Sequence, residues 1–120
     1  MNKRQAGDGW EEAAVHYLEG HGMRILERNF RCRQGEIDIV GQQDGCLCFV
    51  EVKYRRDDAF GSALEAVGTR KQMRICRCAD YYLYRHSQWR EKGVRFDVLA
   101  ICKDRVQWIR NAFDYRGGGR

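Results

Sequence analysis

The sequence lacks an apolar run that approaches the roughly 18 residues of a membrane-spanning helix. Its first residues, Met1–Gln5, are polar and do not have the apolar segment of a secretory signal peptide. We therefore expect a protein that does not contact a membrane and that works in the cytoplasm.

Metal-binding residues with the spacing of a zinc site are also missing. The pairs Cys46/Cys48 and Cys76/Cys78 are separated by one residue, whereas structural zinc sites usually have about two to four residues between their cysteines. The three histidines are scattered, and none is at metal-ligand spacing from another. We expect small buried thiols in a reducing compartment, with neither zinc nor disulfides.

The composition is that of one small domain. The chain has 120 residues, of which 43% are hydrophobic and 32% charged, enough for one buried core. Its 22 basic residues exceed its 17 acidic residues and give a net charge of +5, which is compatible with a nucleic-acid partner without proving one. We expect a single domain over residues 1–116 and a flexible glycine-rich tail at 117–120.

Two short segments, Gly35–Val40 and Leu47–Lys53, have the pattern of paired β-strands. Between them stands Asp44-Gly45, which favours a two-residue hairpin turn because both central residues need a positive φ. A longer even-numbered turn would keep the same cross-strand pairs. Ile37 and Ile39 then share one face, and we expect that face to be core.

The same register places charged side chains on the other face of the hairpin. Asp38 lies opposite Glu51, and Glu36 lies opposite Lys53. Two facing carboxylates repel each other, so a shared proton, a neighbouring cation or a bound metal has to offset the repulsion. Carboxylate oxygens suit Mg²⁺, and a carboxylate pair with a divalent ion and a lysine can hydrolyse a phosphodiester bond. The alternative is a surface ion-pair cluster, with Glu36 bonded to Lys53 and no catalysis.

Hydrophobic periodicity and turn residues predict the order helix, three strands, helix, two strands. This αβββαββ order predicts an α/β fold with a mixed β-sheet of about five strands flanked by two main helices. The second helix should begin with a capping box in which Thr69 is the N-cap and Gln72 occupies N3. The expected segments are a helix at 10–20, strands at 23–32, 35–40 and 47–53, a loop at 54–68, a helix from 69, and strands near 94–102 and 105–110.

An aspartate followed thirteen residues later by Glu-x-Lys, here Asp38 and Glu51–Lys53, resembles the core motif of the PD-(D/E)xK nucleases. More narrowly, the chain resembles the YraN-like family of small bacterial predicted endonucleases, which is similar to archaeal Holliday-junction resolvases. Trp10 and Ala63 depart from the family pattern, which usually has glycine and proline there, and Ile37 stands where the motif's name has proline. The residues that carry the narrower resemblance are Glu11, Ala14, Tyr17, Leu18, Arg28–Arg31, Gly35–Asp38, Phe49–Lys53, Phe60–Ser62, Ala66, Val67, Lys71, Arg74, Tyr82, Leu83 and Arg95–Val98.

The resemblance implies a restriction endonuclease-like core and a metal-dependent active site. Asp38 and Glu51 would hold Mg²⁺ or Mn²⁺, with the backbone carbonyl of Val52 as a further ligand. Lys53 would assist the attacking water. The resemblance also implies that a glutamate of the first helix, Glu11, completes the site.

Two of these acidic residues have competing interpretations. Asp8 to Glu11 has the form of a capping box, in which Glu11 would only bond the start of the helix. For Glu36 we favour a supporting role, in which it orients Lys53 rather than binding the metal.

Several arginines are expected to bind a phosphate backbone. A basic stripe with helical spacing is formed by Arg70, Arg74 and Arg77. The family resemblance implies that Lys71 and Arg74 face the site. For any single arginine, the alternative to phosphate binding is a position on an ordinary solvated surface. The other candidates are three residues of the first predicted strand and two residues just past Lys53: Arg28, Arg31 and Arg33, and Arg55 and Arg56.

The sequence therefore predicts a Mg²⁺- or Mn²⁺-dependent endonuclease that acts on DNA. The resemblance implies structure-specific, resolvase-like cutting, and the sequence leaves open whether the substrate is a junction, a flap, a single strand, a duplex or RNA. A homodimer is expected by analogy, because two symmetric cuts need two active sites. The alternative is a non-catalytic nucleic-acid-binding module that keeps the nuclease fold.

Overall fold

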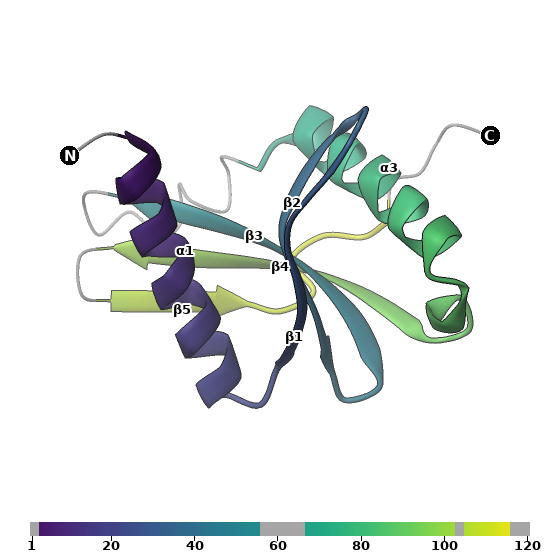
Figure 1. The fold of residues 1–120 in the computed structure, drawn as a ribbon, viewed down its shortest axis with the longest axis horizontal. Coiled ribbons are helices and arrows are strands. Elements are labelled where there is room, and N and C mark those ends of the chain that lie inside the picture. Colours follow the sequence, from purple (N-terminus) through teal and green to yellow (C-terminus); the bar gives the residue numbers. More distant parts are fainter. Residues whose placement is uncertain (1–2, 56–66, 103–104, 116–120) are drawn as a thin grey trace.

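The computed structural model describes residues 3–55, 67–102 and 105–115 (Figure 1). Its element order, αβββαββ, and its five-stranded mixed sheet confirm the predicted α/β fold class and match a restriction endonuclease-like core. The elements are α1 (Lys3–Gly20), β1 (Arg24–Cys32), β2 (Gly35–Gln43), β3 (Cys46–Arg55), α3 (Thr69–Arg85), the 3₁₀ turn η1 (Ser87–Trp89), β4 (Gly93–Cys102) and β5 (Arg105–Ile109).

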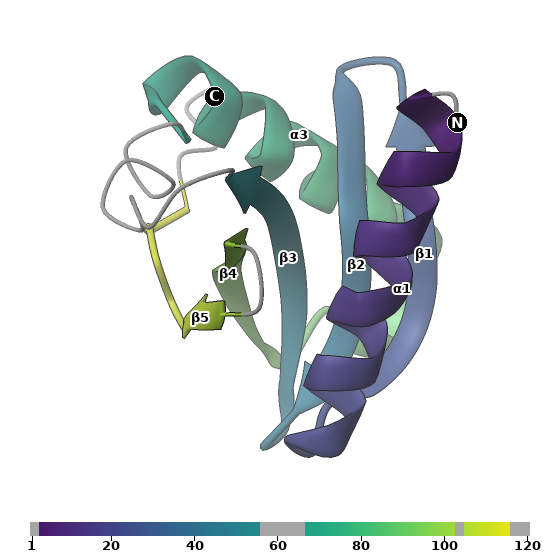
Figure 2. The same ribbon diagram turned by 90° about the vertical axis from the view of Figure 1, so that its left-hand side faces the viewer.

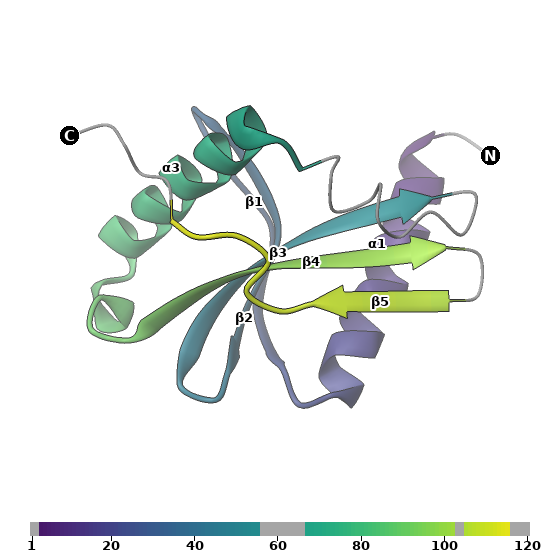
Figure 3. The ribbon, with the colours of Figure 1, turned by 180° about the vertical axis from the view of Figure 1, so that it is seen from behind.

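The strands lie in the order β1-β2-β3-β4-β5, and among the strands of the described residues only the β3–β4 pair is parallel. A parallel pair needs a crossover connection, and α3 lies in the segment that joins β3 to β4. Figure 3 shows β4 running between β3 and β5. None of the helices within the described ranges is both long and apolar enough to span a membrane.

The two helices cover opposite faces of the sheet. In Figure 2, α1 lies in front of β1 and β2, whereas α3 lies behind β2. Alternate residues of β3 enter separate cores: Phe49 packs with Ile75 under α3, and Val50 packs with Leu18 under α1. Because both faces are buried, any charged side chain on β3 has to be accommodated beneath a helix or at the end of the sheet.

The predicted hairpin register is confirmed. Gln43 pairs with Cys46, and Ile39 pairs with Val50. The turn residues Asp44-Gly45 have φ values of 53° and 77°, as a two-residue turn with two positive φ values requires. Beyond Ile39 and Val50, no further Cα pairs join the two strands, which diverge in Figure 1.

This divergence makes one prediction about the core wrong. Ile37 belongs to the cluster under α3, whereas Ile39 belongs to the cluster under α1. Near its start, β2 keeps its pairing with β1 down to Cys32 and Gly35 but has left β3. It therefore twists independently of β3, and the strict alternation expected from a flat hairpin is lost.

The predicted N-cap of α3 is also wrong. Gly68 is the N-cap, with extended backbone angles and no side-chain capping bond, and Thr69 is already inside the helix. The Gln72 side chain instead donates to the carbonyl of Val67 at 2.8 Å. The β-strand conformation of β3 extends to Arg55, and residues 56–66 of the predicted loop lie outside the described part of the chain.

A buried polar network fixes β4 against β5. Asp97 is fully buried and accepts hydrogen bonds from the Arg95 guanidinium, the Trp108 indole and the backbone amide of Asn111. Arg95 also donates to the Gln43 side chain at the end of β2. Because these polar atoms satisfy one another, the network holds β4 and β5 together beside β3, where Asp97 pairs with Val50, the residue before Glu51.

Candidate active site

Two carboxyl groups meet where β2 leaves β3. Glu51 is buried, with 5% of its surface exposed, and Asp38 is partly buried. The backbone amide of Val52 donates a 2.8 Å hydrogen bond to Oδ2 of Asp38. All three residues line a hollow of about 290 Å³, together with Lys71 and Arg74 of α3. The divergence of the strands thus opens space beside the predicted carboxylate pair.

The two carboxyl groups have very different proton affinities. Burial raises the pKa of Asp38 to about 8, and the hydrogen bond to Glu51 and the charge of Glu51 add to this effect. Burial alone would also raise the pKa of Glu51, but the hydrogen bond with Asp38 and the ammonium group of Lys71 outweigh it and lower that pKa. Around neutral pH the metal-free pair therefore holds a proton on Asp38 and a negative charge on Glu51.

Two lysines neutralise this charge. The Lys71 ammonium forms an ion pair with Oε2 of Glu51, and the Lys53 ammonium lies 3.6 Å from the same oxygen. Burial lowers the pKa of Lys53, and its contact with Lys71 lowers it further. For Lys71, the interaction with Glu51 outweighs the effect of burial and raises the pKa. Lys71 is therefore the firmly charged partner, and Lys53 gives up its proton more readily.

The donor set fits a hard divalent cation. Oε2 of Glu51 is buried beside the ammonium groups of Lys53 and Lys71, which both form ion pairs with it. The Val52 amide points toward Asp38, and in an antiparallel strand the N–H and C=O of one residue face the same neighbour. Within the described ranges, no three His, Cys, Asp or Glu side chains gather as a metal cluster. Two carboxylates and a carbonyl leave the other positions to water, which suits Mg²⁺ or Mn²⁺ rather than zinc.

Glu11 lies on the other side of Asp38. Its Oε1 accepts hydrogen bonds from the Arg28 guanidinium at 3.2 Å and from the Asn29 amide at 2.8 Å. The capping-box interpretation is wrong, because α1 already begins at Lys3 and Glu11 is bonded to β1. Glu11 and Asp38 line a second hollow of about 280 Å³. A catalytic role for Glu11 stays a prediction.

Glu36 does not contact the lysine that the sequence predicts. It forms an ion pair with Arg31 on the neighbouring strand β1, at 2.5 Å. The prediction fails because β2 and β3 have diverged at this point, so that Lys53 reaches Glu51 instead. Glu36 still lines both hollows and therefore contributes negative charge beside Asp38.

The predicted phosphate-binding residues divide into two groups. Arg70, Arg74 and Arg77 line a shallow depression on α3, and Arg74 also reaches the hollow that contains the carboxylate pair. On β1, two of these arginines are neutralised by ion pairs: Arg31 by Glu36, and Arg28 by Glu11 and Glu12. Arg33 lies in the β1–β2 turn rather than on a strand, the side chain of Arg55 is not described, and Arg56 lies outside the described residues.

Three residues of the site were not predicted from the sequence as functional. Asn29 has a φ of 56°, a left-handed conformation that asparagine tolerates, and this bend directs its amide to Glu11. Trp10 and Tyr54 come from α1 and β3 and stack beside Asp38, with ring centroids 3.9 Å apart. An isolated asparagine or aromatic residue carries no signal for such contacts, because the partners are distant in the sequence.

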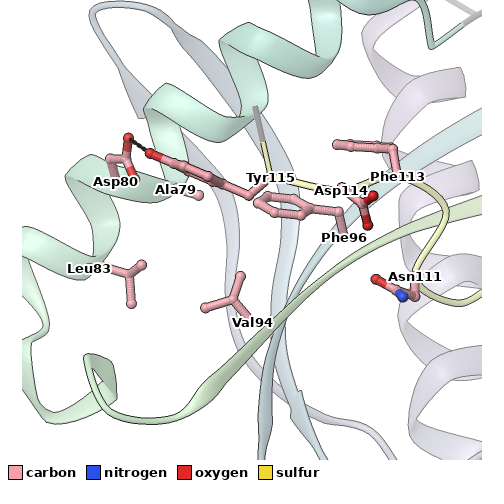
Figure 4. A pocket seen from close by; sticks show the side chains of 9 residues that line it. All are labelled: Ala79, Asp80, Leu83, Val94, Phe96, Asn111, Phe113, Asp114 and Tyr115. Atoms are coloured by element: carbon pink, nitrogen blue, oxygen red, sulfur yellow. Dashed lines mark hydrogen bonds between the residues drawn. The ribbon is translucent and has the colours of Figure 1, made fainter. Parts of the chain in front are cut away.

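A further pocket of about 300 Å³ lies between α3 and the segment that follows β5 (Figure 4). Its walls are formed largely by apolar side chains, including Leu83, Val94 and Phe96. One of its acidic residues, Asp80, accepts a hydrogen bond from the Tyr115 hydroxyl at 2.7 Å. This pocket has no facing carboxylate pair with adjacent lysines, so the candidate active site is the hollow at Asp38 and Glu51.

Comparison with known proteins gives consistent matches. The family model described as "Uncharacterised protein family UPF0102" matches residues 10–101. The UPF0102 protein of Stutzerimonas stutzeri (strain A1501) is 43% identical over 116 residues, covering 92% of this chain and 96% of the relative. The UPF0102 protein of Lachnoclostridium phytofermentans is 45% identical over 117 residues, covering 98% and 99%. A solved structure titled "Crystal structure of SSO0001" is similar with a TM-score of 0.45 and 16% identity, covering 88% of this chain and 50% of that chain.

Proposed function

This chain belongs to the uncharacterised protein family UPF0102, which confirms the predicted family resemblance, and from its own site we propose that it is a metal-dependent nuclease acting on DNA. The family description names no activity, so the proposal depends on the chemistry of the residues around Asp38.

The observation that carries the proposal is a carboxylate pair held together against its own repulsion. Glu51 is buried, and the facing Asp38 has to keep a proton in the metal-free protein. Such a pair costs folding free energy unless something replaces the proton. A divalent cation would do so, and the open hollow beside the pair gives it access.

The proposed roles follow from these positions. Asp38, Glu51 and the Val52 carbonyl would hold Mg²⁺ or Mn²⁺, which polarises a phosphate and lowers the pKa of bound water. Lys53, whose own pKa is lowered, would position the attacking water and exchange a proton with it. Lys71 keeps Glu51 ionised.

The surrounding residues would support the substrate. Arg74 lines the same hollow and would contact a phosphate oxygen, with the neighbouring arginines of α3 continuing the path of the backbone. Glu11 would support the site from the far side of Asp38. As part of this proposal the protein works in the cytoplasm. It would also act as a homodimer, and light scattering with and without DNA would test that oligomeric state.

A cleavage assay tests the proposal. Labelled single-stranded, duplex, flap and four-way-junction DNA would be incubated with the protein in Mg²⁺, in Mn²⁺ and in EDTA. We expect cutting that requires metal and that Asp38→Asn or Glu51→Gln slows by about 100-fold or more. Asp44→Asn, in the hairpin turn, is the matched control and should cut normally. Binding to DNA without cutting, unchanged in both site variants, would favour the non-catalytic module instead.

A further inference from the structure

The second hollow beside Asp38 is lined by two aromatic rings. Trp10 on α1 and Tyr54 near the end of β3 stack with centroids 3.9 Å apart and an interplanar angle of 21°. Tyr54 is 38% exposed, so part of the stacked pair is open to solvent. The rings thus present a flat apolar surface at the edge of a polar site, where a ligand with a planar group can contact it.

This aromatic hollow is contiguous with the hollow that holds the carboxylate pair. Glu36, Asp38 and Val52 line both of them. A ligand that passes from one hollow to the other therefore crosses Asp38, the residue proposed to hold the metal. A group bound on the aromatic rings would be the immediate neighbour of a group that reacts at Asp38.

The charges of the two hollows differ. The described residues that line the aromatic hollow include Glu11, Glu36 and Asp38 but no lysine or arginine, so a phosphate group would find no cationic partner in its walls. The other hollow shares Glu36 and Asp38 but adds the cationic side chains of Lys71 and Arg74, which can bind a phosphate. An uncharged nucleobase needs no cationic partner. It can stack on an aromatic face and donate its exocyclic amino protons to a carboxylate such as Glu11.

We propose that Trp10 and Tyr54 form a subsite for one unpaired nucleobase next to the phosphate that is cut. In a duplex both faces of each base are covered by its neighbours, so a base can reach these rings only when it is unpaired or flipped out. The preferred substrate is then DNA with an unpaired nucleotide at the cut, rather than a continuous duplex. This inference rests on the proposed function, because it takes nucleic acid as the ligand.

Fluorescence anisotropy in EDTA, where no cutting occurs, tests the subsite. Three labelled DNAs are compared: a duplex with a one-nucleotide flap, the same flap without its base, and a blunt duplex. Tyr54→Leu should weaken binding of the base-containing flap by about tenfold and leave the other two unchanged. Trp10→Phe, which keeps a ring, should retain most of the affinity. Tyr84→Leu removes a ring that is 73% exposed on α3 and is the control, with no change expected on any DNA.

Two binding results would overturn the subsite. One is no loss of affinity in Tyr54→Leu. The other is an equal loss on all three DNAs, which would show that the stacking only holds α1 against the sheet.

The Mn²⁺ cleavage assay separates this inference from the proposed function. Cutting by the wild type without a Tyr54-dependent preference would remove the subsite alone. A base-dependent loss of binding without any cutting would remove the nuclease and keep the subsite. Failure both to bind any of the DNAs in EDTA and to cut them in Mn²⁺ would overturn both.

Discussion

Replacing Asp38 with asparagine should stabilise the metal-free protein at alkaline pH. In the wild type, Asp38 is partly buried against an ionised Glu51, and its pKa is raised from 3.8 to about 8. An asparagine of the same shape can still accept the hydrogen bond from Val52 and can donate to Glu51 without carrying a charge. The substitution therefore keeps the contacts with Val52 and Glu51, and the side chain at position 38 no longer has to be protonated to stay neutral.

The magnitude follows from the pKa of Asp38. At about 1.36 kcal/mol per pKa unit, the rise from 3.8 to about 8 corresponds to at most about 6 kcal/mol of stability lost at high pH. Asp38 is not fully buried, and solvent and side chains relax around the carboxylate, so we expect about 2 kcal/mol. For a chain of this size that difference raises the melting temperature by roughly 6–10 °C.

The pH dependence determines the sign of the stability difference between the wild type and Asp38→Asn. A group whose pKa is higher in the folded state contributes stability at low pH, and that contribution is lost as the pH rises through the folded value. Wild type and Asp38→Asn should therefore melt at similar temperatures near about pH 4, and the variant should gain its full advantage above about pH 8. Mn²⁺ should raise the melting temperature of the wild type and not of the variant, because it binds only the intact pair.

Thermal unfolding followed by circular dichroism in EDTA, at several pH values, measures this difference, with Asp44→Asn as the control. A variant that is less stable than the wild type at high pH would refute the reasoning. A stability difference that does not change with pH would refute it equally, because it would show that Asp38 is ionised without penalty.

Three further predictions follow from the same geometry. Lys71→Met should raise the pKa of Glu51 and shift the acidic limb of the cleavage pH profile upward, because Lys71 is the main cation that keeps Glu51 ionised. Arg74→Ala should weaken binding to all DNAs alike and reduce by about one the slope of log affinity against log salt, which binding titrations at several salt concentrations measure. Gly41→Ala should cost about 1–3 kcal/mol in chemical denaturation, because its Cβ would lie 2.5 Å from the Met23 sulfur.

The parts of the site that could be predicted from the sequence are those fixed by local chemistry. The Asp44-Gly45 turn determines the hairpin register by its own backbone preferences, and that register brings Asp38 toward Glu51. Fold class follows similarly from the order of periodic segments. The place where pairing stops could not be predicted, because it depends on how α1 and α3 pack on the two faces of the sheet.

Long-range side-chain contacts were the least accessible to prediction. Glu11 bonds residues 17 and 18 positions away, and no local pattern distinguishes those bonds from a helix cap. The wrong partner for Glu36 has the same cause, since a small twist of β2 decides whether it reaches β1 or β3. The N-cap of α3 also lies one residue earlier than the Thr69 signal predicts, at Gly68, whose backbone is extended and which makes no side-chain capping bond.

The central claim is that the Asp38–Glu51 pair holds a divalent cation in place of a proton. Calorimetric titration of the protein with Mn²⁺ near neutral pH, repeated in buffers of different ionisation enthalpy, tests it most directly. We predict one ion bound per chain, with about one proton released from Asp38, and loss of this binding in Glu51→Gln. Binding that persists in Glu51→Gln, or a wild type that takes up Mn²⁺ without releasing a proton, would contradict the account.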